Sequence, residues 1–530
     1  MIYIGIGNAG CRILWEFHRL LYGDGAPAAP RHVNYFVFGD ADLNNSVLFD
    51  IKDQGLDNVP EPHGVRIMGL DSFWSGGCGV YHIIGEVLAD KAEGEQVLEE
   101  ALKAIPATQP ATIVFSVGGG TGGGVADYLS EYLVQKGRHV RMVGVLPELD
   151  HPDTYDTDDE KSLRINGSDD FQCASAGRFL VKYMNSTMRA GTHPNERDLI
   201  TISNSALANI PERVRLNDAV KRLNHYISHA LMLIETIVAT YTPEQRMITV
   251  GIGTGRRADS TNPLETLTKE LIRTALSPLD LQRPLPTGLS ALPVPIRFYK
   301  RALNLHLSAK GDEETKEARI LRQVLGKCQG VSAWLFCRSE QVQREIQTGG
   351  ASLDNAVREE LERVFGPNVP VDVSLRVGTR YPDDHFPDDE NNKSDVVLLL
   401  SLKNLIVEDI YRLAMFFAES SFAWKEAGVG DVARHIRTLL TRDRPEFRTA
   451  DSDRVKLSLL MEKEITTGNP TIEGRERHPI RFWGNIADLK DKVLQVLQKN
   501  EKDFTDRLLR PADVGGALAF LRNQIWYYEE

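Results

Sequence analysis

Cysteine is scarce in this sequence, and long apolar runs are missing. Only five of the 530 residues are cysteine, and no two of them form a CxxC pair. This pattern excludes a disulfide framework and a zinc site, and it favours a reducing compartment. No apolar run approaches the roughly 20 residues that a membrane-spanning helix needs. The opening MIYIGIGNAG also lacks the basic and apolar segments of a signal peptide. We therefore expect a cytoplasmic protein with no direct membrane insertion.

Positive charge is also in short supply. The net charge of −12 argues against a general binder of nucleic acid or of anionic membranes, because such proteins need basic surfaces. The Walker motif GxxxxGK[ST] does not occur, so no P-loop lysine is available to hold a phosphate. The thirteen histidines form no HExxH pattern, and we predict no protein metal ligand.

Strand and helix signals alternate over the first 280 or so residues. The strand-like runs are IYIGIG, VNYFVFGD, ATIVFSV, VRMVGVLPE and LITISNS. Such alternation predicts a doubly wound parallel sheet with helices on both faces. A proline-rich segment, residues 282–295, predicts a linker. Three further strand-like runs, GVSAWLFCRSE, NVPVDVSLRVGTR and DVVLLLSLKNL, predict a smaller α/β domain. From about residue 427 the signals are mostly helical.

A glycine loop, VGGGTGGG at residues 117–124, lies between the strand ATIVFSV and the helix VADYLSEYLVQKG. Backbone N–H groups without a neighbouring Cβ can converge there at the positive end of a helix dipole. Phosphate oxygens fit such a place, and Thr121 adds a hydroxyl donor. A flexible linker is the alternative, but a linker has no reason to stand tightly between a strand and a helix.

Two more glycine loops precede helices. GIGNAG, residues 5–10, satisfies GxGxxG, and SGGCG, residues 75–79, stands before VYHIIGEVLADKA. GxGxxG alone suggests a dinucleotide-binding oxidoreductase, with Asp40 or Asp42 as the ribose acid. That hypothesis explains only one of the loops, whereas a triphosphate gripped from several sides explains all of them.

These motifs resemble the tubulin/FtsZ superfamily of GTP-dependent filament proteins. GGGTGGG matches the glycine signature of the family, GIGNAGCRI its first phosphate loop, and SGGCGVYHIIG its γ-phosphate-sensing loop. The resemblance runs in order over roughly residues 1 to 282 and implies binding of GTP or GDP, with Mg²⁺ bridging the phosphates. The implied phosphate-binding residues are Gly7, Asn8, Ala9, Gly10, Cys11, Gly76, Gly77, Cys78, Gly79, Gly118, Gly119, Gly120, Thr121, Gly122 and Gly123.

The resemblance also implies where ribose and base are held. LITISNSAL is similar to the strand that carries a base-contacting asparagine, here Asn204, and LNHYIS places Asn224 at the guanine-reading position. An amide can both donate to and accept from the guanine edge. Val220 stands where the family stacks an aromatic ring, and the loss of this stack is expected to weaken the affinity for the base. The choice of guanine over adenine rests on the family resemblance alone. Asp40 is expected on the ribose or phosphate side, and Asp42 remains the alternative.

The implied architecture is a Rossmann-like GTP-binding domain (residues 1–216), a central helix (217–241) and a smaller activation domain (242–426, entered through 242–295). A helical C-terminal extension (427–530) follows. The family forms head-to-tail filaments of its own subunits, with nucleotide between them. A nucleotide-binding member that does not polymerise is the alternative within the family.

Two departures from the family concern hydrolysis and partners. The catalytic acids of the family follow the central helix in an NxDxxD pattern that is absent here, and Glu244 is the only acid in the short connection TPEQR. Glu244 is the candidate catalytic acid, acting on the next subunit, and a solvent-exposed glutamate is the alternative. Near the C-terminus, FLRNQ (residues 520–524) resembles the FtsZ peptide that docks on membrane-linked adaptors. A terminal helix packed on the body, through Phe520, Leu521 and Trp526, is the alternative.

Overall fold

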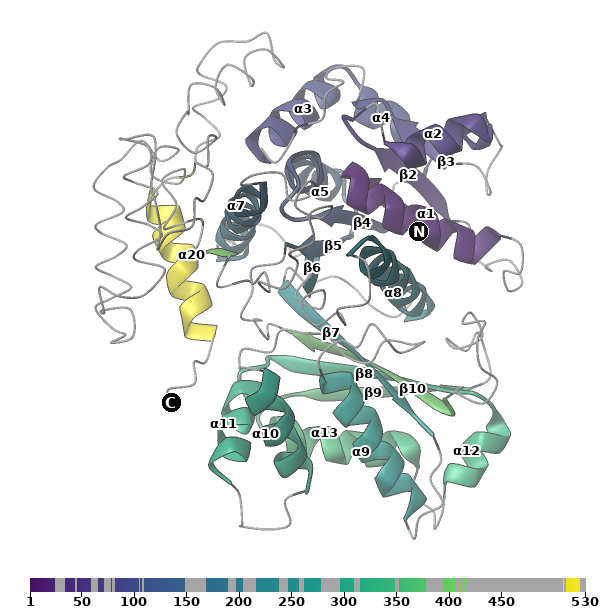
Figure 1. The fold of residues 1–530 in the computed structure, drawn as a ribbon, viewed down its shortest axis with the longest axis vertical. Coiled ribbons are helices and arrows are strands. Elements are labelled where there is room, and N and C mark those ends of the chain that lie inside the picture. Colours follow the sequence, from purple (N-terminus) through teal and green to yellow (C-terminus); the bar gives the residue numbers. More distant parts are fainter. Residues whose placement is uncertain are drawn as a thin grey trace. The chain divides into compact units, whose positions relative to one another are not determined.

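The structure is a computed structural model of the 530-residue chain. It describes residues 1–23, 34–42, 45–58, 65–70, 78, 82–103, 105–106, 109–147, 168–188, 197–203, 216–237, 246–256, 262–277, 296–308, 315–347, 352–377, 394–403, 405, 410, 413–414, 417, 509 and 511–524. These residues fall into two compact units, and each unit is described by itself (Figure 1).

The first unit comprises residues 1–12, 34–195 and 410–522. Its strands pair in parallel in the order β3-β2-β1-β4-β5. β1 and β5 are buried at every residue, as expected of parallel strands that are covered on both faces. The strands are β1 (Ile2–Ile6), β2 (Tyr35–Gly39), β3 (Val65–Met68), β4 (Ala111–Ser116) and β5 (Val140–Leu146).

The helices of the first unit connect these strands or follow them. α1 begins in this unit and continues into residues assigned to the second. The helices are α1 (Gly7–Tyr22), α2 (Ser46–Asp53), the short η1 (Leu56–Asn58), α3 (His82–Gly94), α4 (Val97–Ala101), the π-helical turn η3 (Gly120–Val125), α5 (Ala126–Gln135), α7 (Ser168–Met188) and α20 (Pro511–Gln524).

The second unit comprises residues 13–33, 196–409 and 523–530. Its strand order is β6-β7-β10-β8-β9. β6 pairs with β7, and β8 with β9, in parallel, whereas β10 runs antiparallel to both β7 and β8. The strands are β6 (Arg197–Ser203), β7 (Arg246–Gly255), β8 (Gly330–Cys337), β9 (Val371–Val377) and β10 (Val396–Lys403).

Helices of the second unit share an apolar core with β8 and β10. Leu271 of α9, Leu321 of α11, Leu361 of α13, Leu335 of β8 and Leu398 of β10 all belong to this cluster and are fully buried. In Figure 1, α9, α10, α11 and α13 lie on one side of β8 and β10. The helices of this unit are α8 (Leu216–Ile237), α9 (Pro263–Leu276), α10 (Ile296–Ser308), α11 (Lys316–Leu325), α12 (Glu340–Ile346) and α13 (Leu353–Phe365).

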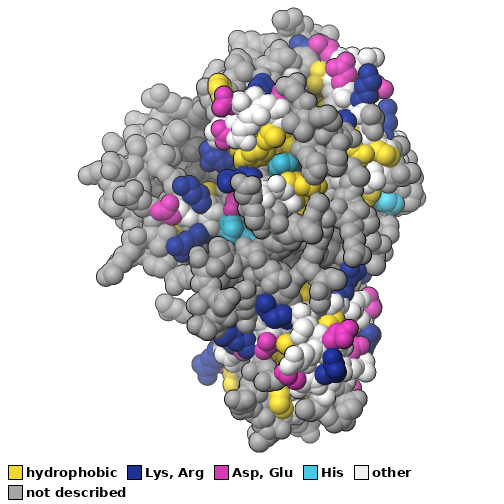
Figure 2. Space-filling model, turned by 90° about the vertical axis from the view of Figure 1, so that its right-hand side faces the viewer, with side chains coloured by type: hydrophobic (Ala, Val, Ile, Leu, Met, Phe, Trp, Pro, Cys, Tyr) yellow, Lys and Arg dark blue, Asp and Glu magenta, His cyan; other side chains and the backbone are white. Residues whose placement is uncertain are grey.

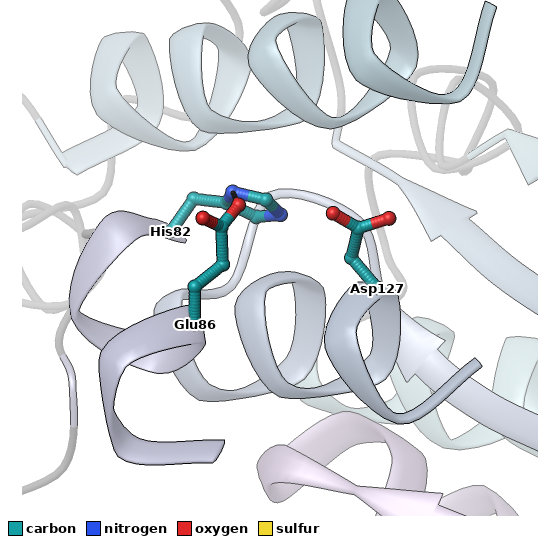
Figure 3. A group of neighbouring side chains, drawn as sticks. All are labelled: His82, Glu86 and Asp127. Atoms are coloured by element: carbon teal, nitrogen blue, oxygen red, sulfur yellow. Dashed lines mark ion pairs between the residues drawn. The ribbon is translucent and has the colours of Figure 1, made fainter. Parts of the chain in front are cut away.

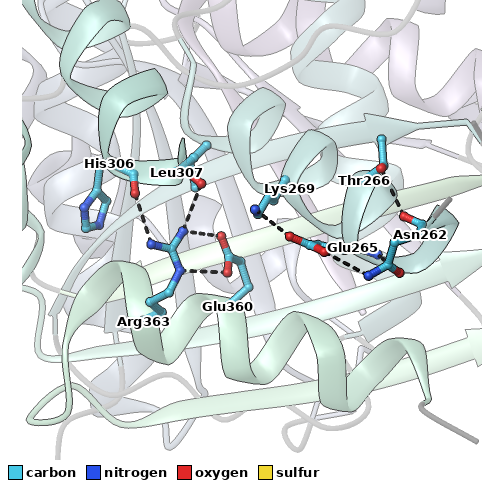
Figure 4. Close-up of polar contacts among 8 residues, drawn as sticks. All are labelled: Asn262, Glu265, Thr266, Lys269, His306, Leu307, Glu360 and Arg363. Carbon is cyan, nitrogen blue, oxygen red and sulfur yellow. Dashed lines mark hydrogen bonds and ion pairs between the residues drawn. The ribbon is translucent and has the colours of Figure 1, made fainter. Parts of the chain in front are cut away.

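Polar contacts fix the ends of two of these helices (Figure 4). Asn262 caps α9: its Oδ1 accepts from the N–H of Glu265, and its Nδ2 donates to the Glu265 carboxylate over 2.8 Å. This reciprocal contact satisfies donors at the helix start. Arg363 of α13 donates to the carbonyls of His306 and Leu307, at 3.0 and 3.3 Å, where α10 ends.

The predicted α/β fold with a parallel sheet is confirmed. Every strand-like run identified in the first half of the sequence forms a strand, and the three later runs form β8, β9 and β10. The long central helix is α8. β3 was missed, because its four residues give too short an apolar run. The proline-rich linker and most residues after 426 lie outside the described residues, and the domain boundaries remain predictions.

None of the described helices combines the length and the apolar character that crossing a bilayer demands. Figure 2 shows acidic and basic side chains interspersed among the described residues of the face in view.

Candidate functional site

A buried glycine loop follows β4. After Ser116 the chain turns into the π-helical residues Gly120–Val125, which continue directly into α5. The N–H of Gly123 donates to the carbonyl of Gly119 over 2.7 Å. Within residues 116–125 only Ser116 and Gly119 are partly exposed. The predicted order of strand, glycine loop and helix is therefore confirmed, and a flexible linker does not fit a loop buried in this way.

Packing within the chain explains most of these glycines but not Gly119. A Cβ added at Gly118, Gly122 or Gly123 would lie only 2.7–2.8 Å from a carbonyl oxygen. A Cβ at Gly119 would approach no atom closer than 3.6 Å, and its φ of −83° suits any residue. Among the described residues, a Cβ at Gly119 would therefore make only ordinary van der Waals contacts, and Gly119 is partly exposed. An anion could approach the backbone there, where a side chain would stand in its way.

The loop GIGNAG (residues 5–10) lies directly against the glycine loop. Gly7, at φ +71°, begins α1, and a Cβ added to it would lie 3.0 Å from the backbone nitrogen of Gly122. Asn8 is exposed and Ala9 partly exposed, so the first turn of α1 reaches solvent. Gly10 is buried where α1 crosses β4, since its Cβ would come within 2.1 Å of the Val114 oxygen. Two helical N-termini thus meet at one place, an arrangement that favours a bound anion.

Cys11 packs in the interior beneath the loop GIGNAG. Its side chain is fully buried, and its thiol donates to the carbonyls of Gly5 and Gly39 at 3.4 and 3.7 Å. Burial, together with the nearby Asp40, raises the pKa of the Cys11 thiol. The side chain is therefore a neutral thiol that ties the ends of β1 and β2 together.

The loop SGGCG (residues 75–79) contacts the glycine loop through one hydrogen bond. The N–H of Cys78 donates to Oγ1 of Thr121 over 3.3 Å, and both side chains are buried. Thr121, expected to offer its hydroxyl to a phosphate, thus also joins the two loops. Burial raises the pKa of the Cys78 thiol to about 12. Gly76, Gly77 and Gly79 lie outside the described residues.

Asp40 is held at the end of β2 by contacts within the chain. Its Oδ1 accepts from the N–H of Ala41 and its Oδ2 from the amide of Asn45, both at 2.8 Å. Asn45 in turn caps α2 by accepting from the N–H of Val47. Burial raises the pKa of Asp40. Asp42 is less buried, so the choice between the two as the ribose or phosphate acid remains open.

Sequence reasoning missed a buried group of ionisable side chains beside the glycine loop. His82 and Glu86 come from α3, Asp127 from α5, and Arg178 and Lys182 from α7. Figure 3 shows His82 and Glu86 on one side, with Asp127 facing them. We call these five residues the ionic cluster.

Lys182 joins the two carboxylates of the ionic cluster. Its Nζ lies 2.5 Å from Glu86 Oε1 and 2.6 Å from Asp127 Oδ2. Arg178 donates to the same Glu86 oxygen at 2.6 Å and also contacts Nδ1 of His82. Two cations and two carboxylates balance one another, which is what a buried group of charges requires.

The ionic cluster shifts the pKa values of its members. Burial alone would raise the pKa of Glu86, but Arg178 and Lys182 outweigh burial and hold it well below its usual range. Burial works against the charge of Lys182, yet Asp127 and Glu86 outweigh it and raise its pKa. Burial lowers the pKa of His82, so this imidazole is neutral at pH 7.

A metal ion does not suit the ionic cluster. Ligand-type atoms of His82, Glu86 and Asp127 all lie within 4.8 Å of one another. The ammonium of Lys182 already contacts both carboxylates, and the Arg178 guanidinium lies beside them. A divalent cation would have to displace one positive charge and remain next to another.

The sequence contained one signal for the ionic cluster. His82 and Glu86, and likewise Arg178 and Lys182, are four residues apart, which places each pair on one helix face. Nothing in the spacing shows that the two faces meet, because α3 and α7 come together only in the folded chain.

The base-side residues lie on α8 of the second unit. Val220 and Asn224 are one helical turn apart and partly buried, and the Asn224 carbonyl accepts from the hydroxyl of Ser228 at 2.8 Å. Asn204 and Glu244 lie outside the described residues, so their roles remain predictions.

The C-terminal motif FLRNQ lies in a helix. Residues 520–524 form the end of α20, and Leu521 is fully buried. These observations favour the alternative of a helix packed on the body over an extended docking peptide. Trp526 lies outside the described residues.

A comparison with known protein families identifies the part of the chain that carries the glycine loops. Residues 1–159 match the family described as "Tubulin/FtsZ family, GTPase domain". No curated protein matches the sequence. A GTPase domain implies binding of GTP or GDP.

Three solved structures illustrate the likeness in shape. CetZ2 from Haloferax volcanii, a GTPγS-bound protofilament, is 14% identical, with 79% of this chain and 97% of that chain covered and a TM-score of 0.48. An empty FtsZ dimer of M. jannaschii is 15% identical, with 76% and 87% covered and a TM-score of 0.42. A GTPγS-form protofilament of TubZ from Bacillus thuringiensis serovar israelensis is 13% identical, with 79% and 91% covered and a TM-score of 0.46.

The family match begins at residue 1, just before β1, and continues past the glycine loop, so it includes all three phosphate loops. The resemblance inferred from those loops is therefore confirmed: residues 1–159 of this chain match the GTPase domain of the tubulin/FtsZ family.

Proposed function

We propose that this chain is a GTP-binding cytoskeletal protein whose subunits assemble head-to-tail into protofilaments. The observation that carries the proposal is the contact between Gly7 and Gly122, beside the partly exposed backbone of Gly119. Backbone N–H groups and two helix N-termini converge there on a place that suits phosphates. The match of residues 1–159 to a GTPase domain supports guanine nucleotide as the ligand.

Phosphate and base are read by different parts of the chain in this proposal. The loops of the first unit bind phosphates through their backbone, and Asn224 reads guanine with its amide. Mg²⁺, when bound, neutralises phosphate charge and keeps several of its waters, so it needs few protein ligands. The neutral thiols of Cys11 and Cys78 add no negative charge to the place where the phosphates lie.

Hydrolysis is proposed to be slow. Residues 238–245 connect α8 with β7, and Glu244 is the one acid there that could polarise water on a neighbouring subunit. A Glu244→Gln variant that pellets normally but releases roughly 100-fold less phosphate would support this role. Unchanged phosphate release would contradict it.

The decisive experiment is high-speed pelleting of purified full-length protein with GTP, GDP or no nucleotide, with released phosphate counted in the same tubes. We expect pelleting with GTP only. If the protein binds GTP but does not pellet, the proposal that the isolated chain assembles is overturned. The alternative of a nucleotide-binding protein that does not polymerise then holds. Binding of NADPH in preference to GTP would overturn the proposed function itself.

The tail adds one proposed partner. Docking of residues 520–524 on a membrane-linked adaptor would require α20 to expose Leu521, because that side chain is buried in the first unit. A peptide of this segment that binds such an adaptor more tightly than the whole chain does would support this release.

A further inference from the structure

Two histidines of α8 lie one turn apart and bring their ring nitrogens together. Nε2 of His225 is 3.0 Å from Nε2 of His229, and the ring centroids are 4.3 Å apart with planes at 67°. The nitrogens are closer to each other than the ring centres are, so each Nε2 lies on the edge that faces the other ring. This is the edge from which imidazole binds a metal ion.

We propose that His225 and His229 bind one divalent transition-metal ion through their Nε2 atoms. Zinc lies about 2.0–2.1 Å from each histidine nitrogen, so two such ligands on a tetrahedral ion stand about 3.3 Å apart. The observed 3.0 Å needs only a small adjustment of either ring to reach this separation. Two imidazoles favour Zn²⁺, Ni²⁺ or Cu²⁺ over Mg²⁺ or Ca²⁺, which prefer oxygen ligands.

Glu16 of α1 orients the first of these ligands. Its Oε1 lies 2.5 Å from Nδ1 of His225. A carboxylate that accepts from Nδ1–H fixes the tautomer that leaves the Nε2 lone pair for a metal, and it raises the basicity of the ring. The three side chains therefore form the carboxylate–histidine–metal arrangement found around protein zinc ions.

The site is open to an incoming ion from one side. The His225 side chain is 38% exposed and that of Glu16 34% exposed, whereas His229 is almost fully buried. An ion reaching His225 from solvent would keep water on its remaining positions. Both Nε2 atoms must act as lone-pair donors. Since His225 keeps its proton on Nδ1 beside Glu16, the proton between the two Nε2 atoms belongs to His229, and it moves to Nδ1 of that ring when the ion binds.

This site is distinct from the phosphate loops and does not depend on the proposed function. HxxxH on α8 lacks the glutamate of HExxH, and its carboxylate comes from α1, a helix far away in sequence. The sequence pattern alone therefore could not reveal it.

Isothermal titration of the untagged, nucleotide-free full chain with Zn²⁺ tests the proposal, with Co²⁺ absorption as a second readout. We expect one ion per chain, loss of binding in His225→Gln and in His229→Gln, and no binding of Mg²⁺ at the same site. Glu16→Gln should weaken binding by roughly 10- to 100-fold, the usual effect of removing such a carboxylate.

His18→Gln is the matched control. His18 also lies on α1, near Glu16, but its ring stacks on Trp15, and its loss should leave the metal affinity unchanged. Unfolding curves recorded with a chelator show that each variant is folded. Zn²⁺ binding that survives in the His225→Gln/His229→Gln double variant, or no stoichiometric binding by the unaltered chain, would overturn the proposal.

Discussion

Lys182 of α7 and Asp127 of α5 form an ion pair of 2.6 Å one residue after α5 begins, where the glycine loop ends. The Asp127 side chain is 2% exposed and that of Lys182 25% exposed. The same ammonium reaches Glu86 of α3. One cation thus joins the helices that follow the second and third phosphate loops.

Replacing Lys182 with Met should destabilise the first unit by about 3 kcal/mol, because it leaves two buried carboxylates without their shared cation. The shift in the urea midpoint measures this cost. Lys91→Met is the control: Lys91 pairs with a mostly exposed Glu95 at 3.9 Å, and its loss should change stability by less than about 0.5 kcal/mol.

A second variant separates the charge of Lys182 from its packing. Adding Asp127→Asn to Lys182→Met removes one stranded charge, so the double variant should be more stable than the sum of the two single effects predicts. If the losses of stability in the two single variants simply add in the double variant, the interaction between Lys182 and Asp127 does not contribute to stability.

The neutral His82 makes stability depend on pH below neutrality. Its pKa is lowered from 6.5 in the folded chain by burial, so between the two pKa values the unfolded chain binds more protons. Stability is therefore lost as pH falls below about 6.5, by up to about 1.4 kcal/mol per pH unit for one group. Urea midpoints between pH 5 and 7.5 should fall less steeply for His82→Gln than for the unaltered chain. Equal slopes would contradict the neutral state.

Gly119→Val should weaken nucleotide binding without unfolding the protein. The added Cβ meets no atom of the described residues closer than 3.6 Å, so the side chain is tolerated but stands where a phosphate is expected to approach the backbone. We expect at least a tenfold loss of affinity, about 1.4 kcal/mol, in a fluorescent-GTP titration. Gly94→Ala, with no atom within 4 Å of its added Cβ, should bind as the unaltered chain does. Normal binding by Gly119→Val would place the phosphates elsewhere.

Arg363→Met should loosen the second unit. The Arg363 guanidinium contacts the Glu360 carboxylate, at 2.9 Å through Nε, and two carbonyls at the end of α10. Losing these contacts should cost about 2 kcal/mol and speed amide hydrogen exchange in α10. Lysine at this position keeps the charge but not the planar fork, so it should restore only part of the stability. Arg344→Met is the control, because that side chain is 77% exposed.

The sequence predicted the parts of the site that depend on neighbours along the chain. The strand and helix around the glycine loop were placed to within about one residue, because apolar periodicity and glycine content are local signals. That the loops serve one triphosphate was inferred from their number, because a dinucleotide explains only one of them.

Long-range pairings could not be predicted in this way. Arg178 and Glu86 are 92 residues apart, and His225 and Glu16 are 209 apart. Their helical spacing showed which faces they occupy but not which faces meet. The individual roles of the phosphate-loop glycines were also hidden, because only the packed structure shows that a Cβ would clash with carbonyl oxygens at Gly118 and Gly122 but would make ordinary contacts at Gly119.

The position of β10 sets the order in which the second unit can be completed during synthesis. β7 and β8 each pair with β10 along its whole length, from Val396 to Lys403. In a nascent chain that ends before Val396, β7 and β8 are both present, but the edge of each strand that pairs with β10 is unpaired. Such edges invite pairing with other chains, so the ribosome-bound protein is most vulnerable to misassembly just before its last described strand emerges.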